Sequence, residues 1–210
     1  MLGGNKMKRS SVILVIVMLC LMFPISAFAL TKGSPGLLDY GYGAGSRAQA
    51  KEYSISFRYA DHLGNRDTWQ VYTAPALNAI RGANGKASLH TSGDVYTGCW
   101  SGAWLMVRYQ KNNGGFRVGW VPKSGINSIQ TVTEWRNANF AYWNVELNSN
   151  CVLTDDPLYE SEALAYASAG EQLTYLAYYQ YNGGREYAYV QGDLDGQPVC
   201  GFIPFEAIDW

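Results

Sequence analysis

The chain repeats a short glycine-to-proline motif at a fixed distance, and this repeat limits the folds that it can adopt. Residues 119–122 read Gly-Trp-Val-Pro, and residues 201–204 read Gly-Phe-Ile-Pro. The shift that carries Gly119 onto Gly201, which we call the repeat offset, also relates Pro75 to Pro157, residues 105–107 to residues 187–189, and Ile126 to Ile208. One offset that fits both ends of a segment indicates a duplicated unit, and we therefore expect two small, related units.

Alternation of apolar and polar residues predicts that these units are built from β-strands. From Tyr53 to Tyr59 every second residue is aromatic or aliphatic, which is typical of a strand with one buried face. Turn sequences such as Asn-Gly at 182–183 separate the predicted strands. Only residues 160–169 suggest a helix, and they are too few for more than a short helical turn. We therefore predict an all-β protein of small barrels, the first at 53–130 and the second at 131–210.

Residues 1–29 have the features of a secretory signal peptide. Three basic residues at positions 6, 8 and 9 precede an apolar run at 11–23, and residues 27–29 read Ala-Phe-Ala, a typical cleavage signal. The apolar run is shorter than the roughly 20 residues that a membrane-spanning helix needs. We expect cleavage after residue 29, secretion to the extracellular space or cell wall, and no membrane span afterwards. Residues 30–52 are rich in Gly, Ser and Ala and predict a flexible leader.

The charge balance argues against nucleic acid as a partner. Removal of the three basic residues of the signal leaves 13 of the 16 Lys and Arg residues beside all 17 acidic ones, a net charge of −4. Binding to phosphate requires clustered positive charge, and no basic run follows the signal. The pair Asp155-Asp156 lacks the spacing of a calcium loop and is more typical of a turn before Pro157. We expect neither a metal nor a cofactor.

Three cysteines follow the predicted signal, at Cys99, Cys151 and Cys200. An odd number in an oxidising compartment allows at most one disulfide and leaves a free thiol. Cys151 opens the first strand of the second unit and Cys200 lies near its last strand, so a bridge between them is geometrically feasible in a small barrel. The alternative is that all three cysteines are buried as small apolar side chains.

Several motifs give the chain a resemblance to a known domain family. Residues 102–107 read Gly-Ala-Trp-Leu-Met-Val and residues 117–121 read Arg-Val-Gly-Trp-Val. These segments resemble the last two strands of the bacterial SH3-like (SH3b) domain family, and residues 170–174 and 201–204 resemble a second, divergent copy with Glu186 in place of the tryptophan. The resemblance implies two tandem, partly open barrels, which in secreted bacterial proteins often hold a partner to peptidoglycan or another envelope polymer.

The sequence offers little support for catalysis. The only nucleophile with a plausible base is Cys99, together with His62 or His90. Cell-wall cysteine peptidases that carry SH3-like domains add a catalytic domain of roughly a hundred residues, and the repeats leave no room for one. We therefore expect a non-catalytic protein, with a small cysteine hydrolase as the less favoured reading.

Aromatic side chains are the predicted ligand contacts, because rings stack on sugars and peptides with little loss of side-chain entropy. By the SH3-like resemblance, five of them lie near the loops that flank the groove of the first unit: Tyr72, Tyr96, Trp100, Trp104 and Trp120. Their alternative role is core packing. The expected partner is peptidoglycan, another envelope polymer or a secreted protein. A structural role, in which a tyrosine-rich face of the second unit is buried in a dimer or heterocomplex, is the competing hypothesis, and the sequence leaves the oligomeric state open.

Overall fold

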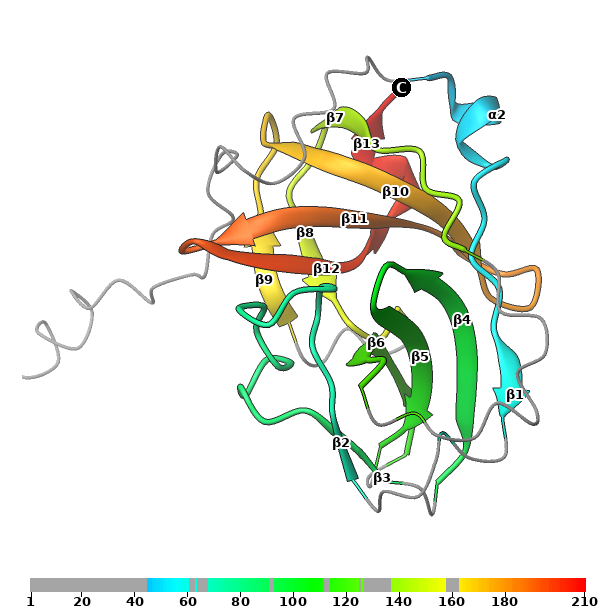
Figure 1. Ribbon diagram of the computed structural model, residues 1–210. Coiled ribbons are helices and arrows are strands. Elements are labelled where there is room, and N and C mark those ends of the chain that lie inside the picture. Colours follow the sequence, from blue (N-terminus) through cyan, green and yellow to red (C-terminus); the bar gives the residue numbers. More distant parts are fainter. Residues whose placement is uncertain are drawn as a thin grey trace, which may run out of the picture.

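The computed structural model describes residues 45–60, 63, 68–90, 93–111, 114–124, 126, 137–157 and 163–210. In these residues β-strands predominate, accompanied by one four-residue α-helix and one 3-10 turn (Figure 1). The prediction of an all-β protein is therefore confirmed. The predicted signal peptide, most of the predicted leader and His62 lie outside the described residues.

The strands of the first unit form a four-stranded sheet and a two-stranded sheet. The order of the larger sheet is β1-β4-β5-β6, and neighbouring strands run antiparallel. Its strands are β1 (Arg58–Ala60), β4 (Val95–Ser101), β5 (Trp104–Gln110) and β6 (Phe116–Pro122), and the smaller sheet pairs β2 (Thr68–Gln70) with β3 (Ser88–His90).

The second unit forms one seven-stranded antiparallel sheet, in the order β13-β7-β10-β11-β12-β8-β9. Its strands are β7 (Trp143–Leu147), β8 (Cys151–Thr154), β9 (Ala163–Ala167), β10 (Gln172–Gln180), β11 (Glu186–Leu194), β12 (Gln197–Pro204) and β13 (Ile208–Asp209), with the 3-10 turn η1 (Phe205–Ala207) before the last. Both larger sheets end in two edge strands, so the described strands form open sheets and not closed barrels.

The one helix suggested by the sequence is wrong where it can be compared. Residues 163–167, inside the suggested segment 160–169, form β9 and pair with β8. Ala165 and Ala167 face the core of the second unit, whereas Tyr166 between them is exposed. Packing against the neighbouring strand therefore overrides the helical preference of an alanine-rich segment.

The two Gly-to-Pro motifs occupy equivalent positions. A Cβ atom on Gly119 would lie 2.9 Å from the carbonyl oxygen of Tyr72, and one on Gly201 would lie 2.8 Å from that of Thr154. The repeat offset relates Tyr72 to Thr154 as it relates the two glycines. In each unit the aromatic residue after the glycine pairs with this crossing residue. Glycine is needed at both places because the crossing strand comes too close for a side chain.

The preceding strand follows the repeat offset less closely than predicted. Met106 lies opposite Trp120 in the first unit, and Tyr189 lies opposite Phe202 in the second. The equivalent of Met106 is therefore Tyr189 and not Ala188, so the predicted match of residues 105–107 with 187–189 is off by one. The turns between the paired strands differ in length, which accounts for the shift.

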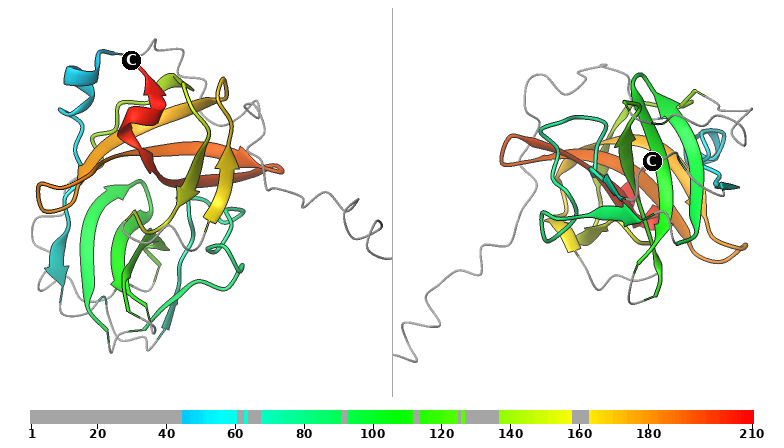
Figure 2. Two further views of the ribbon diagram at one scale, coloured as in Figure 1. Left: turned by 180° about the vertical axis from the view of Figure 1, so that it is seen from behind. Right: turned by 60° about the horizontal axis from the view of Figure 1, so that its bottom comes forward.

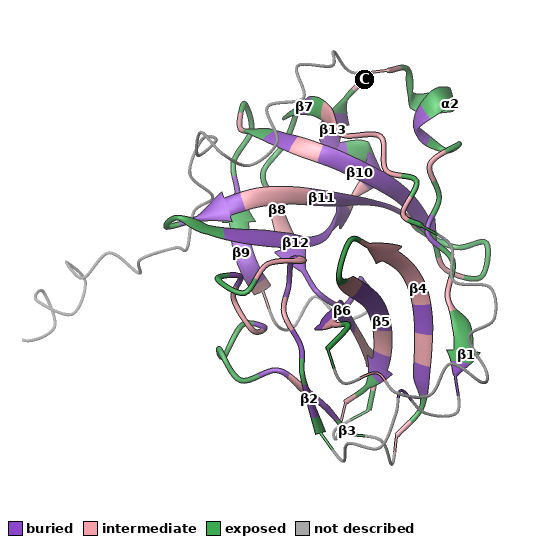
Figure 3. Ribbon diagram, in the orientation of Figure 1, coloured by how far each residue is buried: buried purple, intermediate pink, exposed green. Residues whose placement is uncertain are grey.

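One apolar core joins the two units. It combines first-unit residues such as Met106 and Trp120 with second-unit residues such as Tyr189 and Phe202. Trp120 is fully buried, and its indole Nε1 donates a hydrogen bond of 2.9 Å to the hydroxyl of Tyr189. Each unit also keeps a core of its own. Both sheets contain buried segments (Figure 3), and residues of the two share this core, so the units are packed together and not joined only by a linker.

Part of the predicted leader is folded. Residues 47–50 form the helix α2 (Arg47–Ala50), which Ser46 caps, and Ala50 is fully buried in the core of the second unit. From there the chain runs alongside the seven-stranded sheet to β1 at the edge of the four-stranded sheet (Figures 1 and 2). The prediction of a flexible leader is therefore wrong for residues 45–52, because burial of Ala50 anchors them.

The proposed Cys151–Cys200 bridge is not formed. Cys99, Cys151 and Cys200 are all free thiols. Because Phe202 lies opposite Thr154, the position opposite Cys200 is residue 156, well beyond Cys151 along β8 and the chain that follows it. At ~3.3 Å per residue this separation is about 16 Å, whereas a disulfide needs Cα atoms within about 7 Å. Cys200 instead shares the inter-unit core with Cys99.

Candidate functional site

The five predicted aromatic residues do not form one surface. Trp120 is fully buried in the inter-unit core. Tyr72 and Trp104 pack edge to face, with 5.3 Å between ring centroids, at the border of that core. Trp100 packs against the separate core of the first unit, where the Lys123 ammonium lies 5.4 Å from its ring centroid. Only Tyr96 belongs to a larger exposed group of rings.

That group is a row of side chains across the four-stranded sheet, which we call the aromatic row: Tyr59, Tyr96, Arg108 and Phe116. Tyr59, Tyr96 and Arg108 lie directly opposite one another on β1, β4 and β5. The rings of Tyr59 and Tyr96 are 5.6 Å apart, and those of Tyr96 and Phe116 are 5.8 Å apart. Tyr59 is the most exposed member, with 59% of its surface accessible.

Arg108 holds the aromatic row together. Its guanidinium lies 4.3 Å from the ring centroid of Tyr96 and 4.6 Å from that of Phe116, which are short distances for cation–π contacts. It also lies 5.7 Å from the ring centroid of Phe57, which packs edge to face on Tyr179 of the second unit with 6.0 Å between centroids. The row is therefore fixed in place by the joint between the units, while its outer end stays open to solvent. Of these four residues, the sequence predicted only Tyr96 as a ligand contact. Arg108 lies between the apolar residues Val107 and Tyr109, and this alternation indicates that its side chain lies on the opposite face of the strand from theirs.

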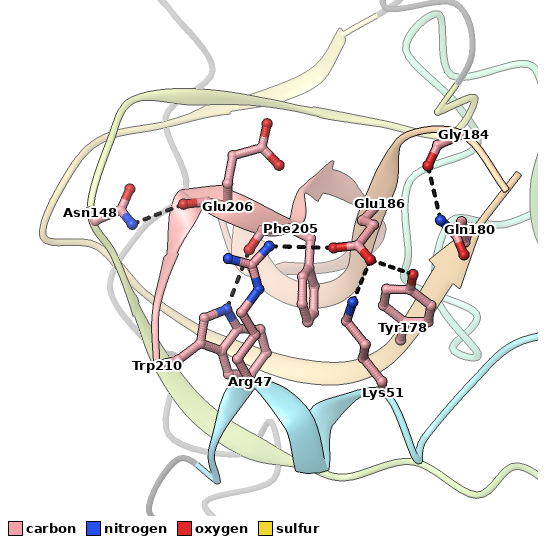
Figure 4. A network of polar contacts seen from close by, with 10 residues as sticks. All are labelled: Arg47, Lys51, Asn148, Tyr178, Gln180, Gly184, Glu186, Phe205, Glu206 and Trp210. Carbon is pink, nitrogen blue, oxygen red and sulfur yellow. Dashed lines mark hydrogen bonds and ion pairs between the residues drawn. The ribbon is translucent and has the colours of Figure 1, made fainter.

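A second group of aromatic side chains lies against the segment of residues 45–55. We call it the aromatic cluster: Trp143, Tyr175, Tyr178, Phe205 and Trp210. Consecutive rings are 4.7–6.4 Å apart from centroid to centroid. The Arg47 guanidinium lies 5.2 Å from the ring of Phe205, and the Lys51 ammonium lies 5.2 Å from that of Tyr178 (Figure 4).

Glu186 is the centre of charge at the aromatic cluster. Its carboxylate accepts hydrogen bonds from Lys51, from Arg47 at 3.3 Å and from the Tyr178 hydroxyl at 2.9 Å (Figure 4). The hydrogen bond from Lys51 is the main reason that the pKa of Glu186 lies below its usual value. Burial, helped by Glu186, raises the pKa of Tyr178 to about 12. A cavity of about 330 Å³ adjoins Glu186 and is also lined by Arg185, Pro204 and Glu206.

Two buried ion pairs cross the joint between the units. The Arg117 Nε atom lies 3.4 Å from Oδ2 of Asp155, and the Lys111 Nζ atom lies 3.6 Å from Oδ2 of Asp156. All four side chains are at most 11% exposed. Burial raises the pKa of Asp155 to about 6, although Arg117 opposes this shift. The sequence predicted a turn at Asp155-Asp156. In the structure, both carboxylates also take part in the packing between the units.

The thiols are poor nucleophiles. Burial raises the pKa of Cys99 to about 12, that of Cys200 to about 12 and that of Cys151 to about 11. His90 lies on β3, where its Nδ1 atom is 3.3 Å from the Thr68 hydroxyl. A thiol attacks as the thiolate, which a raised pKa suppresses at neutral pH.

In the described part of the chain, no three His, Cys, Asp or Glu side chains gather as they would around a metal ion. Nor does any helix described here have the length and apolar character to cross a membrane. Comparisons of the chain with models of protein families, with curated proteins and with solved structures find no match.

Proposed function

We propose that the protein is a secreted, non-catalytic binding protein, whose two units are divergent SH3-like modules, and that it holds a cell-envelope glycan, a peptide or a protein partner on the aromatic row. The observation that carries this proposal is the row itself: three rings and an arginine, fixed by cation–π contacts and open to solvent at Tyr59. Preorganised rings lose little entropy when a ligand stacks on them.

The chemistry of the row suits a ligand with both apolar and polar faces. Ring faces pack on the C–H face of a sugar or on a peptide backbone, and the Arg108 guanidinium supplies donors in a fixed plane for carboxylate or hydroxyl groups. The raised pKa of Cys99 supports a non-catalytic role over the alternative of a cysteine hydrolase. Secretion is proposed from the signal-like character of residues 1–29.

The test is co-sedimentation of the purified protein with insoluble peptidoglycan sacculi. We expect Tyr59→Ala to weaken binding about tenfold, which corresponds to a loss of about 1.4 kcal/mol, within the range for one stacked ring. Tyr59 is exposed, so its removal should leave the fold unchanged. Tyr166→Ala is the matched control, because Tyr166 is 50% exposed but lies on β9 of the other unit.

Equal binding by the wild-type protein and by both variants would remove the aromatic row from the interaction. Absence of the wild-type protein from the pellet would remove peptidoglycan as the ligand, and the same pair of variants would then be compared against soluble secreted proteins. A high salt concentration in the binding buffer separates ring stacking, which persists, from attraction between surface charges, which is screened.

A further inference from the structure

Residues 45–55 lie on the second unit in the manner of a bound peptide. The backbone N–H of Ile55 donates to the carbonyl of Tyr178 at 2.9 Å, and the N–H of Tyr178 donates to the carbonyl of Tyr53 at 2.6 Å. Further back along the segment, the Tyr175 hydroxyl donates to the carbonyl of Ala50 at 2.7 Å. Main-chain bonds of this kind add an extended segment to a sheet without reading its sequence.

Side-chain contacts then select for small residues at two positions. A Cβ atom on Gly45 would lie 2.2 Å from the indole ring of Trp143, so the segment needs glycine there. Ala50 is fully buried against the core of the second unit. Further along the segment, the ring of Tyr53 packs edge to face on Trp143, with centroids 5.3 Å apart.

Charge supplies a third element of recognition. Arg47 and Lys51 are four residues apart, a spacing that places both on one side of a helical turn. Both reach the single carboxylate of Glu186, and both cations lie over rings of the aromatic cluster (Figure 4). The cavity of about 330 Å³ beside Glu186 offers space for further residues of a ligand.

The attachment of α2 is nevertheless limited. The helix has four residues, of which only Ala50 is buried. The side chains of Arg47 and Lys51 are 53% and 41% exposed, and exposed ion pairs contribute little to stability. The rings beneath belong to β7, β10 and the C-terminal residues, which pack on one another independently of the segment.

We infer that the aromatic cluster and Glu186 form a peptide-docking surface, which the chain's own residues 45–55 occupy and from which a basic peptide of the same pattern can displace them. The peptide that fits has small residues at the positions of Gly45 and Ala50. It has cations at the positions of Arg47 and Lys51. This inference concerns a different face from the aromatic row and does not rest on the function proposed for that row.

The test measures binding of a peptide in trans. A fluorescein-labelled peptide of residues 45–56 is titrated with the full chain and followed by fluorescence anisotropy. In the wild-type protein the resident segment competes, so the apparent Kd equals the intrinsic Kd divided by the fraction of molecules whose surface is open. The double variant Arg47→Ala/Lys51→Ala weakens that competition, and we expect it to bind the peptide severalfold more tightly.

Matched controls define the site. Glu186→Gln, added to the double variant, should abolish the gain in affinity, and so should a peptide in which Lys51 is replaced by glutamate. Lys86→Ala, in an exposed loop of the first unit, should bind as the wild type does. A folded double variant that binds no more tightly than the wild type would overturn the inference, because the segment would then be an integral part of the fold.

Hydrogen exchange of the unmodified protein gives a second measurement that does not depend on the variants. The amide of Ile55 is hydrogen-bonded to Tyr178, and Val190 lies within the strand β11. If the segment detaches, the amide of Ile55 exchanges much faster than that of Val190. Addition of excess unlabelled peptide should accelerate exchange at Ile55 further. Equal protection of both amides, unchanged by peptide, would also overturn the inference.

Discussion

Protonation of Asp155 should stabilise the protein, in contrast to the usual behaviour of a paired carboxylate. Its side chain is 4% exposed, and burial raises its pKa from 3.8 to about 6 despite the neighbouring Arg117. The folded state therefore binds the proton more tightly than the unfolded state does. The stability contributed by this group is present below pH 4 and is lost as the pH rises through about 6.

The magnitude follows from the size of the shift. A rise of about two pKa units corresponds to about 3 kcal/mol, at about 1.4 kcal/mol per unit. Asp155→Asn keeps the shape and one acceptor oxygen but cannot ionise. We therefore expect the free energy of unfolding of the wild type, relative to that of Asp155→Asn, to fall by up to about 3 kcal/mol between pH 4 and pH 7.

Urea unfolding of both proteins at pH 4, 5, 6 and 7 measures this difference directly, provided that the dependence on urea concentration is the same for both. Asp94→Asn is the control, because that residue is exposed and its substitution should leave the difference flat. A wild-type protein that gains stability over Asp155→Asn as the pH rises would refute the reasoning, since attraction to Arg117 would then outweigh burial.

Two further predictions concern packing and the thiols. Gly201→Ala should lower the free energy of unfolding by about 2–3 kcal/mol and the Tm by about 5–10 °C, because the new methyl group would lie 2.8 Å from the Thr154 carbonyl oxygen. Gly93→Ala, where the nearest atom is 3.8 Å away, is its control, and equal melting temperatures would contradict the proposed close approach. Iodoacetamide at pH 8 should label Cys99 and Cys200 at least ~100-fold more slowly in the folded protein than in denaturant, because few of their thiols ionise. A peptide mass that shows Cys151 joined to Cys200 would contradict the free thiols.

The sequence predicted several strands correctly: the run around Leu173 to Tyr179 lies within β10, and the Gly-Phe-Ile-Pro motif lies within β12. The alternation from Tyr53 to Tyr59 was a poorer guide. Only residues 58 and 59 of that run belong to a strand, β1, and Tyr59 is 59% exposed instead of facing a core. Local composition was a weaker guide. The alanine-rich residues 163–167 form a strand because a neighbouring strand buries them, and this depends on contacts distant in the sequence.

The candidate sites were harder to predict because they depend on how the two units meet. Trp120 and Trp104 alternate with aliphatic residues, which is compatible with either a core or a binding role, and only the packing of the second unit decides that Trp120 is core. Tyr59 and Phe116 come next to Tyr96 through pairing of strands that are far apart in the chain. The Gly- and Ala-rich composition that suggested a leader is also what allows residues 45–50 to lie close against Trp143.

The Gly-to-Pro motif occupies equivalent positions in the two halves of the molecule, but the joint between these halves is asymmetric. The repeat offset relates Thr73-Ala74 to Asp155-Asp156, and both pairs are buried. In the first unit these positions are uncharged, with Ala74 in the inter-unit core. In the second unit they are two carboxylates, which meet Arg117 and Lys111 of the first unit.

This difference fixes which surface meets which. By the same offset, the second unit has Val199 where the first has Arg117. The shift of one residue found for the preceding strand places Leu194 where the first has Lys111. If the units met the other way round, a buried acidic pair would face the equivalents of Val199 and Leu194, two apolar residues, instead of two cations. Burial of a charge without a partner costs several kcal/mol, so that arrangement is strongly disfavoured. A repeated unit thus acquires a unique pairing through a few charged residues, because those charges penalise the alternative as well as supporting the observed joint.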